Sequence, residues 1–213
     1  MMTLVITILA SLISVVNPLG AVPVFLSLTP DYTRQERNKT ALLTSIYFSM
    51  ILLAFFWGGT YILSFFGVSI YALRIAGGIV IMMSGFALLQ GKFAKNRVTT
   101  QVREEALEKD DISFTPMAMP MLSGPGSISL LIGYFAEYPT LHERFIIAAV
   151  IILLGIIIYF ILRMSPMLAR VLGAGGLKAI SRIMGFIVIA ISVEYIISGV
   201  VALVASVSSG GAY

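Results

Sequence analysis

Two proline–glycine interruptions within apolar sequence are the features of this chain best suited to binding chemistry. The first is Asn17-Pro18-Leu19-Gly20, and the second is Gly124-Pro125-Gly126-Ser127. Proline lacks an N–H and clashes with the preceding turn, so each interruption can end one half-helix and begin another. The backbone N–H groups left free at a helix start carry partial positive charge and bind anions such as a carboxylate.

The two interruptions occupy matching places in the two halves of the chain. Arg74 follows Pro18 at almost the same spacing as Arg182 follows Pro125, and each arginine opens an Arg-x-x-Gly element. Interrupted apolar segments at corresponding positions are the best sequence indication of a transporter's substrate site. A simple kinked helix is the alternative, since proline and glycine are common in membrane helices. The agreement in register favours a shared cavity facing the interior.

The composition is that of a membrane-embedded protein. Hydrophobic residues make up 59% of the 213 residues and charged residues 11%, whereas soluble domains carry about 25% charged residues. The mean hydropathy is +1.01. A net charge of +4 does not indicate nucleic-acid binding, because the basic residues lie between apolar runs. The lipid bilayer is therefore the expected surroundings. Cysteine is absent, which excludes disulfides and thiolate chemistry.

Uncharged stretches predict an all-α, polytopic fold with six membrane-spanning helices, since a helical span needs about 20 apolar residues. The predicted spans are residues 3–28, 41–63, 70–90, 112–136, 144–163 and 182–205. The domain organisation is a three-helix repeat (1–90), a polar linker (91–111), a second repeat (112–205) and a tail (206–213). With three spans in each half, the second repeat enters the membrane inverted relative to the first. The first and fourth helices would be broken.

Basic residues predict the orientation. The loops after the first, third and fifth spans hold eleven lysines and arginines, whereas the other side has Arg144 alone. The positive-inside rule places the basic side in the cytoplasm. Both termini are then expected outside, and the linker 91–111 is expected in the cytoplasm.

Of the charged residues within the predicted spans, three are candidates for gating or coupling. Arg74 and Arg182 lie just inside the starts of the third and sixth spans. They either gate the cavity and hold its broken helix ends, or extend to the lipid headgroups. Glu194 is the acid deepest within a span. It either carries a coupling proton or pairs with Arg74.

Enzyme chemistry is not predicted. The sole histidine, His142, falls in an outer loop, and no histidine base lies near the serines of the second interruption. The spans contain no His/Asp/Glu cluster of the kind that holds a metal, and the chain contains no phosphate-binding loop. We expect no catalytic residues, no metal and no cofactor.

The chain resembles the MarC family of six-span bacterial and archaeal membrane proteins, over nearly its whole length. The resemblance is carried by Asn17-Pro18-Leu19-Gly20 with Pro23 and Phe25-Leu26, Arg74-Ile75-Ala76-Gly77-Gly78, Met119-Pro120 with Ser123-Gly124-Pro125-Gly126, and Arg182-Ile183-Met184-Gly185. Members of a close branch, the SnatA-like proteins, transport small neutral amino acids such as glycine and alanine. The resemblance thus implies an amino-acid transporter in the plasma membrane, which in bacteria is the inner membrane.

The predicted function is secondary transport of a small zwitterion by alternating access. The predicted substrate site comprises Asn17, Pro18, Gly20, Gly124, Pro125, Gly126 and Ser127. Half-helix N-termini would hold the carboxylate, and Asn17 with exposed carbonyls would hold the ammonium group. Coupling to a proton or to sodium and assembly into an oligomer both remain open. The alternatives are a channel or exporter for another solute or cation, and a membrane subunit that does not transport.

Overall fold

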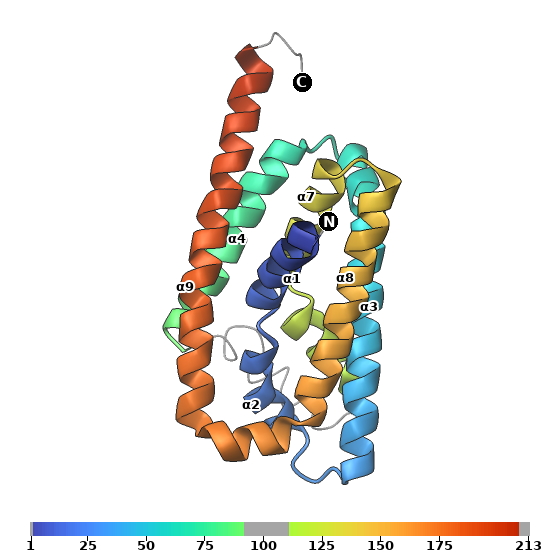
Figure 1. The fold of residues 1–213 in the computed structure, drawn as a ribbon, viewed down its shortest axis with the longest axis vertical. Coiled ribbons are helices and arrows are strands. Elements are labelled where there is room, and N and C mark those ends of the chain that lie inside the picture. The colour runs from blue at the N-terminus through green and yellow to red at the C-terminus, as the bar shows by residue number, and fades with distance from the viewer. Residues whose placement is uncertain (1, 92–110, 209–213) are drawn as a thin grey trace.

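The computed structural model describes residues 2–91 and 111–208, and the regular elements of that part of the chain are helical (Figure 1). In chain order they are α1 (Met2–Val16), α2 (Pro18–Leu28), α3 (Arg34–Phe65), α4 (Ile70–Leu89), η1 (Ser113–Leu122), α7 (Pro125–Glu137), α8 (Leu141–Arg163) and α9 (Ser165–Ser208). Within the described ranges, five helical segments are long and apolar enough to span a membrane, with Met2–Leu28 taken as one. The all-α prediction is therefore confirmed.

The long helices begin at side-chain caps. Thr33 and Thr140 precede α3 and α8, and each accepts a hydrogen bond from the backbone N–H three residues on. Ser69 caps α4 in the same way. Such caps satisfy N–H groups that have no partner within the helix. They explain why α3 and α8 start ahead of the predicted positions 41 and 144.

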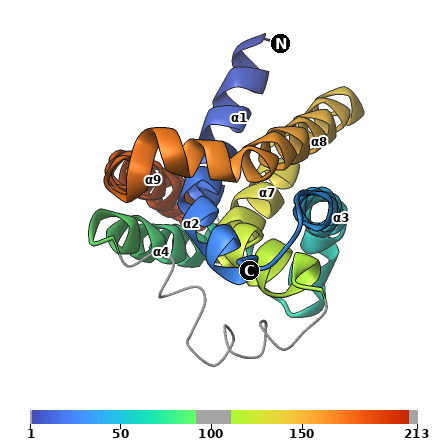
Figure 2. The same ribbon diagram turned by 90° about the horizontal axis from the view of Figure 1, so that it is seen from below.

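Two pairs of long helices enclose the broken segments. The helix α4 packs along α9 and α3 packs along α8, while α2 and α7 lie between these pairs (Figures 1 and 2). The α4–α9 contact is close at Gly85 and Gly185. A Cβ added to Gly85 would lie 3.0 Å from the Gly185 carbonyl oxygen, and one added to Gly185 would lie 2.9 Å from the Gly85 oxygen. Small residues at this crossing permit backbone approach, as membrane helix pairs commonly require.

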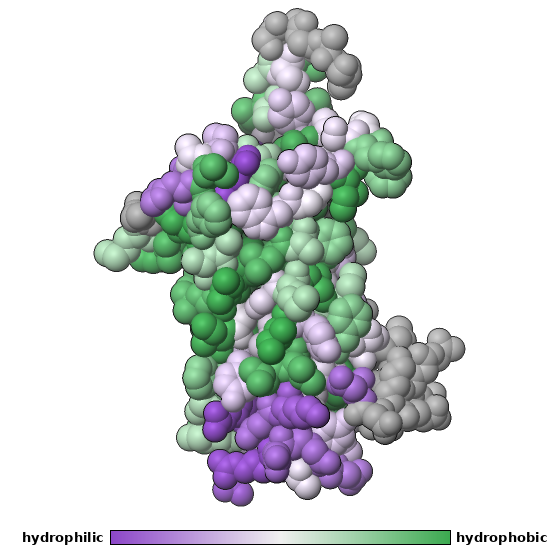
Figure 3. Space-filling view, turned by 90° about the vertical axis from the view of Figure 1, so that its right-hand side faces the viewer, coloured by the Kyte–Doolittle hydropathy of each residue, from purple (hydrophilic) through white to green (hydrophobic). Residues whose placement is uncertain are grey.

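Hydrophobic side chains dominate the middle of the surface, and hydrophilic ones gather at its lower end (Figure 3). That end contains the start of α3, the end of α8 and the start of α9 (Figure 1). We call it the basic end, after its residues Arg34, Arg37, Lys39, Arg163, Arg170 and Lys178. The pattern fits a protein whose middle is covered by lipid.

The last helix differs from the prediction. Span six was expected at 182–205, with the basic residues ahead of it in a loop, but α9 begins at Ser165. The helix turns at Gly173, where φ is 62°, a conformation that glycine adopts without steric cost. The predicted tail was also placed too early, because α9 continues to Ser208. Of the predicted linker 91–111, residues 92–110 lie outside the described residues.

The fourth predicted span, 112–136, is not one continuous helix. It consists of the irregular segment η1 and the short helix α7. Thr115 and Met119, each followed by proline, have extended backbone angles within η1. The residue before a proline disfavours the helical region, and proline itself lacks a donor. The first part of this span is therefore not a half-helix, whereas the second part is.

Candidate substrate site

The first interruption separates α1 from α2 at Asn17. Its backbone is left-handed (φ 49°, ψ 63°), a conformation that asparagine tolerates better than most residues. Pro18 then begins α2, and the side chain of Asn17 is 1% exposed. The amide Nδ2 of Asn17 has no hydrogen-bond partner. A buried donor without a partner is costly and uncommon, and it calls for an explanation.

The second interruption begins α7 at Pro125. Gly124 has an extended backbone, and the Ser127 hydroxyl donates to its carbonyl oxygen over 2.9 Å. Ser123, directly ahead of the break, is fully buried, and its hydroxyl has no partner. The sequence predicts that the breaks face the interior. At the second break Gly124 and Gly126 are buried, whereas Pro125 between them is exposed. Because proline has no N–H, its ring can face outward while the donors that follow it stay inside.

The two interruptions lie close together. A Cβ added to Gly126 would lie 3.5 Å from Cγ1 of Val15, which is two residues ahead of Asn17, and 3.0 Å from Cγ1 of Ile81 in α4. The start of α7 therefore packs against the end of α1. From this region α2 runs toward the basic end and α7 runs toward the opposite end (Figure 1).

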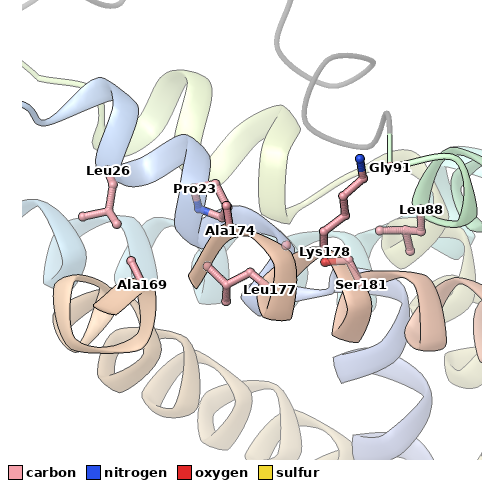
Figure 4. Close-up of a pocket in the computed structure, with 10 residues that line it drawn as sticks. Pro23, Leu26, Leu88, Gly91, Ala169, Ala174, Leu177, Lys178 and Ser181 are labelled. Atoms are coloured by element: carbon pink, nitrogen blue, oxygen red, sulfur yellow. The ribbon is translucent and has the colours of Figure 1, made fainter. Parts of the chain in front are cut away.

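A pocket of about 420 Å³ lies between α2, the end of α4 and the start of α9. Its lining residues are Gly20, Pro23, Leu26, Leu88, Gly91, Ala169, Ala174, Leu177, Lys178 and Ser181. Figure 4 shows residues of α2 and α9 facing one another across it, with Lys178 reaching toward Gly91. The volume is typical of small-molecule sites, which span roughly 300–1,000 Å³ and combine apolar walls with few polar groups.

Gly20 brings the Asn17 amide and the pocket together. A Cβ added to Gly20 would overlap Asn17 Nδ2 and would lie 3.3 Å from the Ser181 hydroxyl oxygen. The unpartnered amide and the serine therefore both border the space beside Gly20. Of the seven predicted site residues, Gly20 lines this pocket, while the others lie at the two interruptions without lining it.

Polar contacts join the helices at the end opposite the basic end. Arg74 Nη2 of α4 lies 3.0 Å from Glu137 Oε2 at the end of α7. Tyr195 of α9 donates its hydroxyl hydrogen to the Ser129 carbonyl oxygen over 2.8 Å, in a buried contact. These contacts join α4, α7 and α9 beyond the second interruption, whereas the pocket lies toward the basic end.

None of the three predicted gating or coupling residues lines the pocket, and Arg74 lies at the opposite end beside Glu137. Glu194 and Arg182 are exposed on α9, and neither lines the pocket. The predicted pairing of Glu194 with Arg74 is wrong, because Arg74 pairs with Glu137. The position of Glu194 along its predicted span placed it at a depth in the membrane similar to that of Arg74. That position did not indicate the direction in which the Glu194 side chain points.

Sequence reasoning missed the polar residues that accompany the breaks. Ser181 directly precedes Arg182 and is the residue that borders Gly20. A sequence signal was present. The separation from Arg74 to Ser181 equals that from Pro18 to Pro125, so Ser181 is the residue of the second repeat that corresponds to Arg74. Glu137 was missed because it lies 63 residues from its partner Arg74, and pairing at that distance has no local signature.

The comparison with known families decides the classification. A model of the MarC family integral membrane proteins matches residues 2–204. The chain belongs to the MarC family. It is thus an integral membrane protein, consistent with the five long apolar helical segments found within the described residues. The matched range includes both interruptions.

Relatives of this MarC-family chain come from bacteria and archaea. The UPF0056 membrane protein MJ1677 of Methanocaldococcus jannaschii is 38% identical over 192 residues, covering 90% of this chain and 93% of the relative. The UPF0056 membrane protein YhcE of Escherichia coli K12 is 35% identical over 189 residues, covering 89% and 88%. The UPF0056 inner membrane protein MarC of Escherichia coli UTI89 is 33% identical over 207 residues, covering 92% and 93%. No solved structure matches the chain.

Proposed function

We propose that this MarC-family protein is a secondary transporter of small neutral amino acids such as glycine and alanine. Its location would be the plasma membrane, as the inner-membrane name of one relative suggests. The basic end would face the cytoplasm, in keeping with the positive-inside rule. The observation that carries the proposal is the buried, unpartnered amide of Asn17 at the start of a half-helix beside a pocket.

The chemistry of the site suits a zwitterion. Asn17 Nδ2 is a donor, so we now assign it to the substrate carboxylate rather than to the ammonium group. The N–H groups at the start of α2 would add partial positive charge on the same side. Ser181 Oγ can accept from the ammonium group. Lys178, the charged residue among those found to line the pocket, would attract an anionic group to the mouth. A cation alone would find no carboxylate among these lining residues.

Alternating access would follow from two inverted three-helix repeats. Three features of the fold support this arrangement. The helix α2 runs toward the basic end and α7 toward the other (Figure 1). In addition, α2 packs on α9 where α7 packs on α4. Finally, the pocket lies toward the basic end while Arg74 and Glu137 join helices at the opposite end. We infer a state open toward the basic end, from which rocking of one repeat against the other would expose the site to the other side.

Uptake by the purified protein in liposomes tests the proposal. Labelled glycine and alanine should enter under an imposed proton or sodium gradient, and unlabelled alanine should compete. Leucine and phenylalanine should compete weakly, because Asn17, Gly20 and Ser181 leave little room beside the half-helix start. Folded protein that moves neither glycine nor alanine under any gradient would contradict the proposal. Flux of another solute or of a cation would instead favour a channel or exporter.

A further inference from the structure

Two arginines outside the pocket bind carbonyl groups at the ends of the half-helices and, for α2, in the loop that follows. Arg37, the fourth residue of α3, donates from Nη2 to the carbonyl oxygens of Thr29 (2.9 Å) and Tyr32 (3.3 Å). It also donates from Nε to the Thr29 hydroxyl oxygen over 3.3 Å. Thr29 is the C-cap residue of α2, directly after its last helical residue. Arg37 thus joins the end of α2 to the start of α3.

Arg144 makes the corresponding contact for α7. It is the fourth residue of α8 and donates to the carbonyl oxygens of Tyr138 (3.1 Å) and Phe135 (3.2 Å). Its guanidinium group lies 3.7 Å from the centre of the Phe135 ring. Tyr138 is the C-cap residue of α7, directly after its last helical residue. In both cases the two carbonyl groups belong to residues three apart.

The two arginines follow the same local motif. Glu36 N–H donates to the Thr33 hydroxyl over 3.3 Å, and Glu143 N–H donates to the Thr140 hydroxyl over 3.3 Å. The sequence therefore reads Thr-x-x-Glu-Arg at both places. The separation between the two copies equals that between Pro18 and Pro125. The motif thus belongs to the repeat that contains the half-helices.

The half-helices need support at these ends. They have 11 and 13 residues, so the unpaired backbone groups of the terminal turns make up a large share of each helix. The last carbonyls of a helix have no partner within it and form the negative end of its dipole. A guanidinium group offers a rigid fork of donors that can bind two carbonyl oxygens at once.

We propose that Arg37 and Arg144 are paired positioning residues, one at each end of the molecule. Each fixes a half-helix to the long helix that follows it, so that α2 moves with α3 and α7 moves with α8. The start of each half-helix, at its interruption, is thereby held in place from its far end. The significance for transport rests on the proposed function. The positioning of the two half-helices by these arginines does not depend on that proposal.

Cysteine accessibility tests the pairing directly, because the chain has no cysteine. Val24→Cys in α2 and Leu131→Cys in α7 are matched reporters at equivalent positions of the two repeats, 7% and 0% exposed. We expect Arg37→Ala to speed modification of the Val24→Cys reporter by N-ethylmaleimide about tenfold or more, as loss of one charge-assisted hydrogen bond allows. The Leu131→Cys reporter should change less than about twofold. Arg144→Ala should show the reverse pattern.

The controls separate positioning from general destabilisation. Arg34→Ala and His142→Ala remove exposed side chains from the same helix turns and should move neither reporter. Arg37→Lys and Arg144→Lys should restore part of the protection, and they provide the measurement if an alanine variant fails to fold. Equal responses of both reporters to each arginine variant, or responses no larger than those of the controls, would overturn the proposal. The labelling uses no substrate, so a failure of amino-acid uptake leaves this result readable.

Discussion

Replacing Asn17 with glycine is expected to lower kcat/KM for alanine uptake about 10- to 150-fold. Hydrogen bonds to charged groups are worth about 1.5–3 kcal/mol, and each 1.4 kcal/mol corresponds to about a tenfold change. Glycine keeps the left-handed backbone at this position (φ 49°) without strain. It also removes the buried donor that has no hydrogen-bond partner. Folded yield and thermal stability should therefore change little, and uptake measured in liposomes reports the loss.

The matched control is Thr44→Val. Thr44 is also fully buried, and its hydroxyl oxygen also lacks a partner, but it lies within α3 and not at a half-helix start beside Gly20. Its replacement should leave uptake within about twofold of the parent. If both variants lose activity equally, or if neither loses it, the amide of Asn17 is not a substrate ligand.

Replacing Gly20 with valine is expected to reduce uptake about 100-fold or more, since displacing a positioned group by about 1 Å can have an effect of this size. A side chain at Gly20 would overlap Asn17 Nδ2 and approach the Ser181 hydroxyl oxygen. The valine would therefore displace the amide and fill the space beside it. Both the maximal rate and the affinity for alanine should fall in liposome assays.

Gly58→Val provides the comparison for this variant. Gly58 lies within α3, and a Cβ added there would meet no atom within 4 Å. Valine has a higher helix propensity than glycine, so neither substitution is penalised in propensity, and Gly58→Val should insert and transport like the parent. Normal uptake by folded Gly20→Val protein would show that the substrate passes elsewhere.

The sequence predicted the structure best where proline constrains the backbone. Pro18 and Pro125 predicted the starts of α2 and α7, because proline is favoured at the first position of a helix. The apolar runs predicted α4 closely, as its ends at Ile70 and Leu89 show. The membrane class followed from composition, and the family match confirms it.

Other features depended on information that spacing does not contain. Basic residues before span six suggested a loop, but they lie on a helix at the basic end, where charged side chains remain hydrated. The predicted span 112–136 includes Pro116 and Pro120, and two prolines four residues apart leave the segment irregular. The depth of Glu194 in its span did not indicate that its side chain is exposed.

Substrate protection at Ser181 tests the central claim most directly. Ser181→Cys places a thiol of similar size at the pocket wall beside Gly20, in a chain without other cysteines. We expect glycine and alanine to slow its modification by a thiol reagent in a saturable manner, and we expect the protection to disappear when Asn17→Gly is added. A modification rate that no small neutral amino acid changes, in folded protein that the reagent reaches, would contradict a substrate site at this half-helix start.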